Sequence, residues 1–207
     1  DGWLTIVTQG LDGHAARAVR TSHPLWIVEA LHEALGGHGA QIDKLLAADN
    51  VPPRVTLVAR PGLAAPESLP GTPGKLSPYA RILDEGGDPG EIAEVRDGRA
   101  GVQDEGSQLV AIALADAAVD GPDAQWLDLC AGPGGKAALL GALAAQHGAR
   151  LTANEVQEHR AELVRHGVRR LGNVDVTVHD GREGPWDAAS FDRVLVDAPC
   201  TGLGALR

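Results

Sequence analysis

The stretch Leu127-Asp-Leu-Cys-Ala-Gly-Pro-Gly-Gly-Lys136 joins a short apolar segment to a helical pattern rich in Ala and Leu, and it decides the predicted fold. Gly132, Gly134 and Gly135 allow the backbone to turn tightly and to approach a ligand without a clash from a Cβ atom. The spacing matches neither the phosphate-binding P-loop nor Gly-x-Gly-x-x-Gly. Taken alone, the stretch fits both a nucleotide-binding loop and a generic strand-to-helix turn.

Short apolar runs alternate with helical patterns on both sides of this stretch. Ala161, Val164 and Val168, for example, share one face of a helix at spacings of three and four. Strands are expected at 125–129, 150–154, 174–178 and 191–196, and helices at 106–119, 136–147 and 158–171. Alternation of this kind predicts βαβ units, and therefore an α/β domain with a Rossmann-like parallel sheet over residues 100–207.

Residues 1–99 are less regular, and we expect them to form a small α+β region. A helical pattern runs from His14 to Leu35, and Ser22-His-Pro24 provides a helix start signal within it. A further helix is expected at 42–48 and a strand at 55–59. Residues 60–90 are crowded with Pro and Gly, which predicts turns and short extended pieces.

The composition favours a globular protein of the cytoplasm. The 207 residues are 43% hydrophobic, and no apolar run approaches the ~20 residues that span a bilayer. The two cysteines lie in motifs rich in Gly and Pro, and the eight histidines show no metal-binding spacing, so we predict neither a disulfide framework nor a metal. Met is absent, and a sheet that stops at its fourth strand leaves an exposed edge. We therefore expect further chain at both ends.

The charge balance is unfavourable for strong nonspecific RNA binding. The formal net charge is −10, whereas nucleic-acid binders usually carry a basic excess or a basic stripe. Arg160, Arg165, Arg169 and Arg170 cluster locally, and we interpret this cluster as a solvated helix face.

Acidic side chains follow three of the predicted strands. Glu155 closes the second strand, Asp180 follows the third, and Asp197 follows the fourth. Ligands bind at the carboxyl ends of parallel strands, where Glu155 could accept hydrogen bonds from ribose hydroxyls and Asp180 from an adenine amino group. One such carboxylate is commonly a helix cap. Four consecutive strand ends thus carry the glycine-rich loop and three carboxylates. Together they predict a nucleoside site, and we predict S-adenosylmethionine as its ligand.

The two cysteines lie at the same predicted edge of the sheet. The thiolate of Cys200 could add to carbon 6 of a cytosine and make carbon 5 able to accept a methyl group, while Asp197 holds the base edge. A small buried apolar cysteine is the alternative, but the Pro and Gly neighbours favour an exposed loop. We expect Cys130 to pack within the cofactor loop or to offer backbone contacts, without a catalytic role.

These motifs together resemble the bacterial RNA cytosine-5 methyltransferases of the RsmB type, also called Sun or Fmu, in the NOL1/NOP2/Sun family. The resemblance is carried by Leu127–Lys136, Glu155, Asp180 and Asp197-Ala-Pro-Cys-Thr-Gly-Leu-Gly204, and upstream by Ser22-His-Pro-Leu-Trp26 and Val102-Gln-Asp-Glu-Gly-Ser-Gln-Leu-Val-Ala111. It runs through most of residues 20–207.

The resemblance implies methylation of a cytosine in small-subunit ribosomal RNA. It implies a seven-stranded methyltransferase sheet, here truncated at its C-terminal end, behind a small RNA-facing region over residues 1–99. The NusB-like helical domain usual in this family is expected to be missing. The implied cofactor contacts are Cys130, Ala131, Gly132, Pro133, Gly134, Gly135, Lys136, Glu155, Asp180 and Asp197.

The resemblance also changes the role expected for Cys200. In the RNA enzymes a second cysteine, in a later Thr-Cys motif, attacks the base, and the Pro-Cys cysteine helps to release the product. The sequence ends at Arg207 before any such motif, so the nucleophile is expected to be absent from it. Two alternatives stay open, namely a methyltransferase of another substrate class and a non-catalytic RNA-binding fragment.

Overall fold

The structure, a computed structural model, describes residues 2–84 and 86–199. The chain divides into two compact units at Pro53 and Arg54. This boundary differs from the one predicted at 99 and 100. Residues 54–99 join the second unit because they hydrogen bond to the α/β part, for example through Gln108 Nε2 and the Leu57 carbonyl, 3.4 Å apart.

The first unit is helical. Its helices are α1 (Gly2–Val7), α2 (Gly13–Thr21), α3 (Leu25–Ala34) and α4 (Gly39–Asp49). The helical pattern predicted from His14 to Leu35 is interrupted, as its internal start signal indicates, because Ser22 takes a left-handed φ of 58° and Pro24 precedes α3. Ala18, Val28, Ile42 and Leu46 form the core of this unit.

A small antiparallel sheet opens the second unit. Its strands are β1 (Thr56–Ala59), β2 (Thr72–Pro73), β3 (Ala80–Ile82) and β4 (Ala100–Val102), in the order β2-β3-β1-β4. The short helix α5 (Ala93–Arg96) precedes β4. Of these strands the sequence predicts β1, whereas β2, β3 and β4 are too short to show a period of their own. The sheet buries Leu57, Ala59, Leu69 and Ala100.

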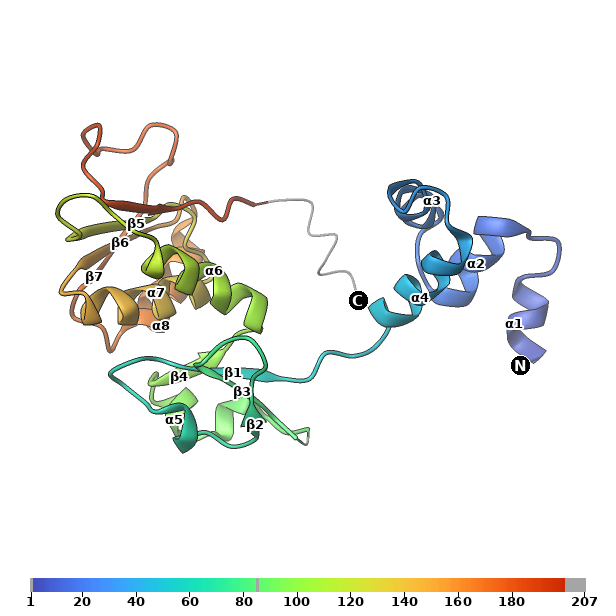
Figure 1. The fold of residues 1–207 in the computed structure, drawn as a ribbon, viewed down its shortest axis with the longest axis horizontal. Helices are drawn as coiled ribbons and strands as arrows, with labels where there is room; N and C mark the ends of the chain where they lie inside the picture. The colour runs from blue at the N-terminus through green and yellow to red at the C-terminus, as the bar shows by residue number, and fades with distance from the viewer. Residues whose placement is uncertain (1, 85, 200–207) are drawn as a thin grey trace. The chain divides into compact units, whose positions relative to one another are not determined.

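The remainder of the second unit is the predicted α/β domain (Figure 1). The strands β5 (Gln125–Asp128), β6 (Arg150–Asn154), β7 (Val174–Thr177) and β8 (Arg193–Leu195) are parallel, in the order β7-β6-β5-β8. The helices are α6 (Glu105–Asp116), α7 (Gly135–Gln146) and α8 (Glu158–Val168). The predicted strands and helices of this domain are therefore confirmed, with ends that differ by up to three residues.

The core of this domain lies between the sheet and its helices. Trp126 and Leu151 from the strands pack with Leu139, Leu140 and Leu143 of α7. Helix α7 is apolar on all sides because it packs between α6, α8 and the sheet. The chain builds outward from β5 to β6 and β7, then returns to β8 on the other side of β5. This reversal creates a switch point, the place where open α/β sheets bind ligands.

No helix in the described part of the chain is long and apolar enough to cross a membrane.

Candidate functional site

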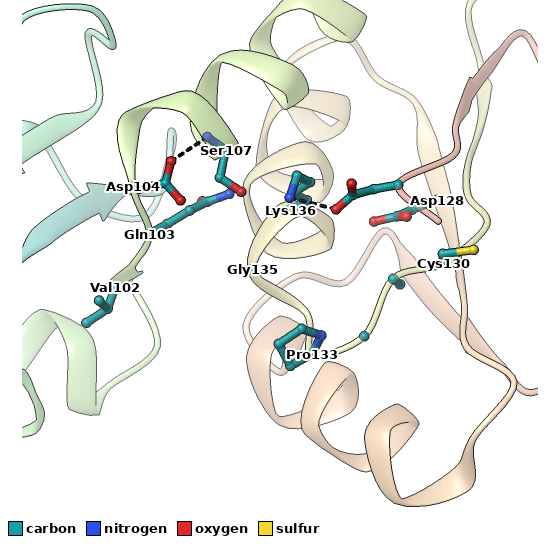
Figure 2. Close-up of a pocket in the computed structure, with 12 residues that line it drawn as sticks. Val102, Gln103, Asp104, Ser107, Asp128, Cys130, Pro133, Gly135 and Lys136 are labelled. Carbon is teal, nitrogen blue, oxygen red and sulfur yellow. Dashed lines mark hydrogen bonds and ion pairs between the residues drawn. The ribbon is translucent and has the colours of Figure 1, made fainter. Parts of the chain in front are cut away.

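A cavity of about 230 Å³ opens at the carboxyl ends of β5 and β8. Two segments enclose it, as Figure 2 shows: the turn from β4 into α6 on one side, and the loop from β5 into α7 on the other. The cavity therefore lies at the switch point of the parallel sheet. Its lining comprises Val102, Gln103, Asp104, Ser107, Asp128, Cys130, Ala131, Gly132, Pro133, Gly135, Lys136 and Asp197.

The glycines of the loop are required by close contacts. A Cβ atom on Gly132 would lie 2.2 Å from Oε2 of Glu155, and one on Gly134 would lie 3.0 Å from the Cα of Val164 in α8. Gly134 also has a left-handed φ of 108°. Gly135 begins α7 and lines the cavity, so the free N–H groups of the helix start are available to a negatively charged ligand group.

Glu155 lies beside this loop, as the sequence predicts, although it does not line the cavity. Its side chain is buried and accepts hydrogen bonds from the N–H groups of Gly132 and Gln157, both at 3.1 Å. Arg160 from α8 lies 3.7 Å from the Glu155 carboxylate and donates to the Gly132 carbonyl at 2.5 Å. Each carboxylate oxygen of Glu155 thus accepts one hydrogen bond from a described residue, which leaves acceptor capacity for a ligand hydroxyl.

Asp180 lies farther along the same edge of the sheet, after β7, and does not line the cavity. It accepts from the Arg182 guanidinium, with the closest nitrogen 2.5 Å away, and from the Arg182 backbone N–H at 3.0 Å. The Arg182 side-chain hydrogen bonds and then its backbone N–H lower the pKa of Asp180 to about 2. The carboxylate is therefore ionised at neutral pH and already has a partner.

Asp197 follows β8 and lines the cavity, in agreement with the predicted edge. Its Oδ2 lies 2.7 Å from Nζ of Lys136, the last residue of the glycine-rich stretch. The Asp197 side chain is half exposed, so this ion pair remains accessible to solvent and to a ligand. Cys200 lies outside the described residues.

Asp128 is a buried carboxyl group that the sequence prediction missed. It ends β5, lines the cavity and is 1% exposed. Within the described chain neither of its oxygens has a hydrogen bond of good geometry, although the Cys130 amide lies near enough to favour the charged form. Burial, reinforced by Asp197 and Glu155, raises the pKa of Asp128 to about 7. The strand-end rule that selected three other carboxylates would have found it, had it been applied to β5.

Gln103 faces the cavity from the opposite side and was also missed. Its backbone N–H donates to the Thr56 carbonyl at 3.0 Å, and its carbonyl accepts from Gln108 Nε2 at 2.8 Å, which fixes the turn from β4 into α6. Both polar atoms of its side-chain amide are buried and lack a partner among residues 2–84 and 86–199. Buried polar groups normally have hydrogen-bond partners, so Asp128 and Gln103 mark a place where a polar ligand belongs.

Cys130 is half-buried within the loop. Burial, followed by the nearby carboxylates of Asp128, Glu155 and Asp197, raises the pKa of its thiol. A thiol rather than a thiolate is therefore expected at neutral pH, which disfavours nucleophilic attack by this cysteine. Among the described residues no group of three or more His, Cys, Asp or Glu side chains is placed to hold a metal ion.

Comparison with known proteins decides the family. Residues 116–207 match the family model described as 16S rRNA methyltransferase RsmB/F. This part of the chain belongs to the RsmB/F methyltransferase family. The family resemblance expected from the motifs is thereby confirmed.

Individual relatives match nearly the whole chain. "Putative methyltransferase Rv1407" of Mycobacterium tuberculosis is 53% identical over 199 residues, which cover 94% of this chain and 42% of that protein. "Probable ribosomal RNA small subunit methyltransferase B" of Bacillus subtilis is 32% identical, covering 92% of this chain and 44% of that protein. The chain therefore spans less than half the length of these two relatives.

Solved structures confirm the Rossmann-like methyltransferase fold. The crystal structure of PH0851 superposes with a TM-score of 0.76 at 22% identity, covering 94% of this chain and 46% of that one. A methyltransferase homolog protein from Pyrococcus horikoshii gives a TM-score of 0.62 at 18% identity, covering 80% of this chain and 55% of that one.

Proposed function

We propose that the protein transfers a methyl group from S-adenosylmethionine to carbon 5 of a cytosine in small-subunit ribosomal RNA. The observation that carries this proposal is the cavity at the switch point. It is lined by the glycine-rich loop, which lies within the stretch that matches the RsmB/F family model, and by two buried polar side chains without partners among the described residues. An RNA substrate and the free thiol of Cys130 together support a cytoplasmic location.

The described residues fit this cofactor in both its parts. The strand order β7-β6-β5-β8 sets Asp180, Glu155, the glycine-rich loop and Asp197 side by side along one edge. We assign Asp180 to the adenine and Glu155 to the ribose. The amino-acid part then falls at the end of β5, where the Asp128 carboxylate can accept from an ammonium group and the Gln103 amide can donate to a carboxylate.

The acceptor base is assigned to the β8 side of the cavity. When bound, S-adenosylmethionine supplies an electrophilic methyl group. Asp197, close to Lys136, can accept hydrogen bonds from the edge of a cytosine and so orient its ring. We propose that a cysteine adds to carbon 6 of this ring and that Cys200 promotes release of the product, as the family resemblance implies. The cofactor contacts of Cys130, Ala131, Gly132, Pro133, Gly134, Gly135 and Lys136 stay proposals of the same kind.

Two measurements test the function. The 207-residue chain should bind S-adenosylmethionine in isothermal titration calorimetry, and the protein as encoded in its gene should transfer labelled methyl groups to small-subunit rRNA. Bisulfite sequencing should then read 5-methylcytosine. Methyl transfer confined to amino nitrogens would show a methyltransferase of another class, and cofactor-independent RNA binding without transfer would show a non-catalytic RNA-binding protein.

The role of Cys200 needs its own variant. In the protein as encoded, C200A should bind S-adenosylmethionine as tightly as the wild type does and should accumulate a covalent adduct with RNA that survives denaturing electrophoresis. The reason is that attack would proceed while release is blocked. Loss of every adduct in C200A would instead assign the attack to Cys200.

A further inference from the structure

Four arginines gather where the end of α8 meets the small sheet. Arg60 donates through Nη1 to the carbonyls of Gly98, at 2.7 Å, and Gly167, at 2.6 Å. Arg169 Nη2 donates to the Arg96 carbonyl at 2.7 Å, and Arg170 Nε donates to the Asp97 carbonyl at 3.0 Å. We call Arg60, Arg96, Arg169 and Arg170 the arginine cluster. Its elements α5, β4 and α8 all belong to the second unit (Figure 1).

The cluster lacks the carboxylate partners that most other arginines of the described chain have. In the described part of the protein none of its four members forms an ion pair with a carboxylate, and the hydrogen-bond acceptors of Arg60, Arg169 and Arg170 are main-chain carbonyls. A carbonyl orients a guanidinium but leaves its positive charge uncompensated. Two carboxylates lie nearby, Glu94 on α5 and Asp97 in the turn after it. Both form ion pairs with Arg99, Glu94 at 3.6 Å and Asp97 at 3.5 Å.

Positive charge is concentrated here as a result. Arg60 is buried, and its Nε has no partner in the described chain. Burial, followed by repulsion from Arg169, lowers the pKa of Arg60 to about 10. The side chains of Arg96, Arg169 and Arg170 are exposed, so the uncompensated charge is presented to solvent.

The structure thereby divides the arginines that the sequence grouped on one helix. Arg160 lies beside Glu155, which follows β6, and Arg165 pairs with Glu158 and Glu162 on α8, so both of these arginines have carboxylate partners. Arg165 lies on the solvated face of α8, as interpreted from the sequence. Arg169 and Arg170 are exposed, but they follow the end of α8 and donate to the carbonyls of Arg96 and Asp97.

We propose that the arginine cluster binds phosphate groups of the RNA whose target base enters the cavity. This inference rests on the proposed function. Strand β4 connects the two places, because Gly98 precedes it at the cluster and Gln103 follows it at the cavity. At 3.3 Å per residue the five-residue separation is about 16 Å, a distance that a few nucleotides bridge. In a protein with a net charge of −10, a local cluster is where phosphate contacts can form.

The test compares two variants with the same change in charge. R96Q/R170Q removes two members of the cluster, chosen because Arg96 contributes only its carbonyl to these contacts and Arg170 a single side-chain N–H. R150Q/R165Q is the matched control, since Arg150 and Arg165 are paired with carboxylates. Affinity of the 207-residue chain for a single-stranded fragment of small-subunit rRNA is measured by fluorescence anisotropy from 0.05 to 0.5 M KCl, concentrations chosen around the ~0.1 M range where screening changes steeply.

The cluster variant should lose salt dependence as well as affinity. Each lost phosphate contact reduces the steepness of log K against log salt by about 0.7, so the loss of two contacts reduces it by about 1.4. Across the tenfold range from 0.05 to 0.5 M KCl, the affinity lost by the variant relative to the wild type should therefore be about 25-fold greater at the low-salt end. The control should keep the wild-type slope, and both variants should bind S-adenosylmethionine as the wild type does. If the melting temperature of R96Q/R170Q is lower than that of the wild type, the comparison is made between the single variants R96Q and R165Q.

Two outcomes would overturn the inference in distinguishable ways. Equal affinity and equal slope in the cluster variant and the control would refute the arginine cluster as an RNA contact and leave the proposed function standing. Absence of any salt-dependent RNA binding by the wild-type chain and by the protein as encoded would remove the proposed function together with the inference.

Discussion

Replacing Asp128 with Asn should make the free energy of unfolding fall less as the pH rises. Asp128 is buried at the end of β5, and no residue in the ranges 2–84 and 86–199 gives it a hydrogen bond of good geometry. Its pKa is raised from 3.8 to about 7, first by burial. In the unfolded chain the carboxyl group loses its proton near pH 4, whereas in the folded protein it keeps the proton up to about pH 7. Stability is therefore lost as pH rises through this window, and D128N has no such loss.

The size of the effect follows from the two pKa values. With 1.36 kcal/mol per pH unit, a carboxyl group of this kind destabilises the fold by about 2 kcal/mol at pH 5.5 and by about 4 kcal/mol at pH 8. The stability of D128N relative to wild type should thus increase by up to about 2 kcal/mol between these two pH values. The amide has nearly the shape of the carboxyl group, so packing around β5 should change little.

The assay is urea unfolding of the second unit at several pH values. Trp3 and Trp26 lie in the first unit and are exposed, so a W3F/W26F background leaves the fluorescence of Trp126 and Trp186 to report on the second unit. A carbon-13 titration of the Asp128 carboxyl group should give a midpoint near 7 directly. A constant difference between D128N and wild type, within about 0.5 kcal/mol at every pH, would refute the reasoning. A titration midpoint in the ordinary range for Asp would do the same.

Three further predictions concern residues at the proposed cofactor site. At pH 6 roughly nine-tenths of Asp128 should be protonated, so binding of S-adenosylmethionine should release almost one proton. Calorimetry in buffers of different ionisation enthalpy measures this release, and D128N should release no proton. Q103A should weaken S-adenosylhomocysteine about ten-fold by losing one hydrogen bond, yet leave methylthioadenosine, which lacks the amino-acid part, unchanged; equal losses for both would contradict our assignment. G132A should lower the free energy of unfolding of the second unit by about 1–3 kcal/mol, because the new Cβ would lie 2.2 Å from Glu155. G172A has open space around it and should leave the free energy of unfolding unchanged in the same urea titration.

Most of the parallel sheet could be predicted from the sequence because its signals are local. Strand β6 was predicted with its observed ends, Arg150–Asn154, and the face shared by Ala161, Val164 and Val168 is buried in α8. Hydrophobic periodicity and glycine conformation depend on neighbouring residues, so they can be recognised without knowledge of the fold. The small antiparallel sheet could not be predicted in the same way, because β4 has three residues and exists through its pairing with β1.

The boundary between the units shows the same limit. Residues 54–99 are irregular in composition, yet the structure places them with the α/β domain because Arg60 and Leu57 contact α8 and α6 across long sequence separations. Such contacts leave no local pattern. The expectation that residues 1–99 face the RNA accordingly stays a prediction, to which the arginine cluster adds a specific surface.

The glycine-rich loop, the strand-end carboxylates and the family were therefore determined by the sequence, since each depends on residue types at fixed local spacing. The tertiary structure alone decided that Gln103 faces the loop across a cavity and that Asp128 is buried with no hydrogen bond of good geometry to any described residue. It also decided that, within the described chain, Arg165 forms ion pairs with carboxylates whereas Arg169 and Arg170 donate to carbonyls. The physical reason is that desolvation and ion pairing depend on which distant segments fold together, and it is these energies that set the charge of each group in the site.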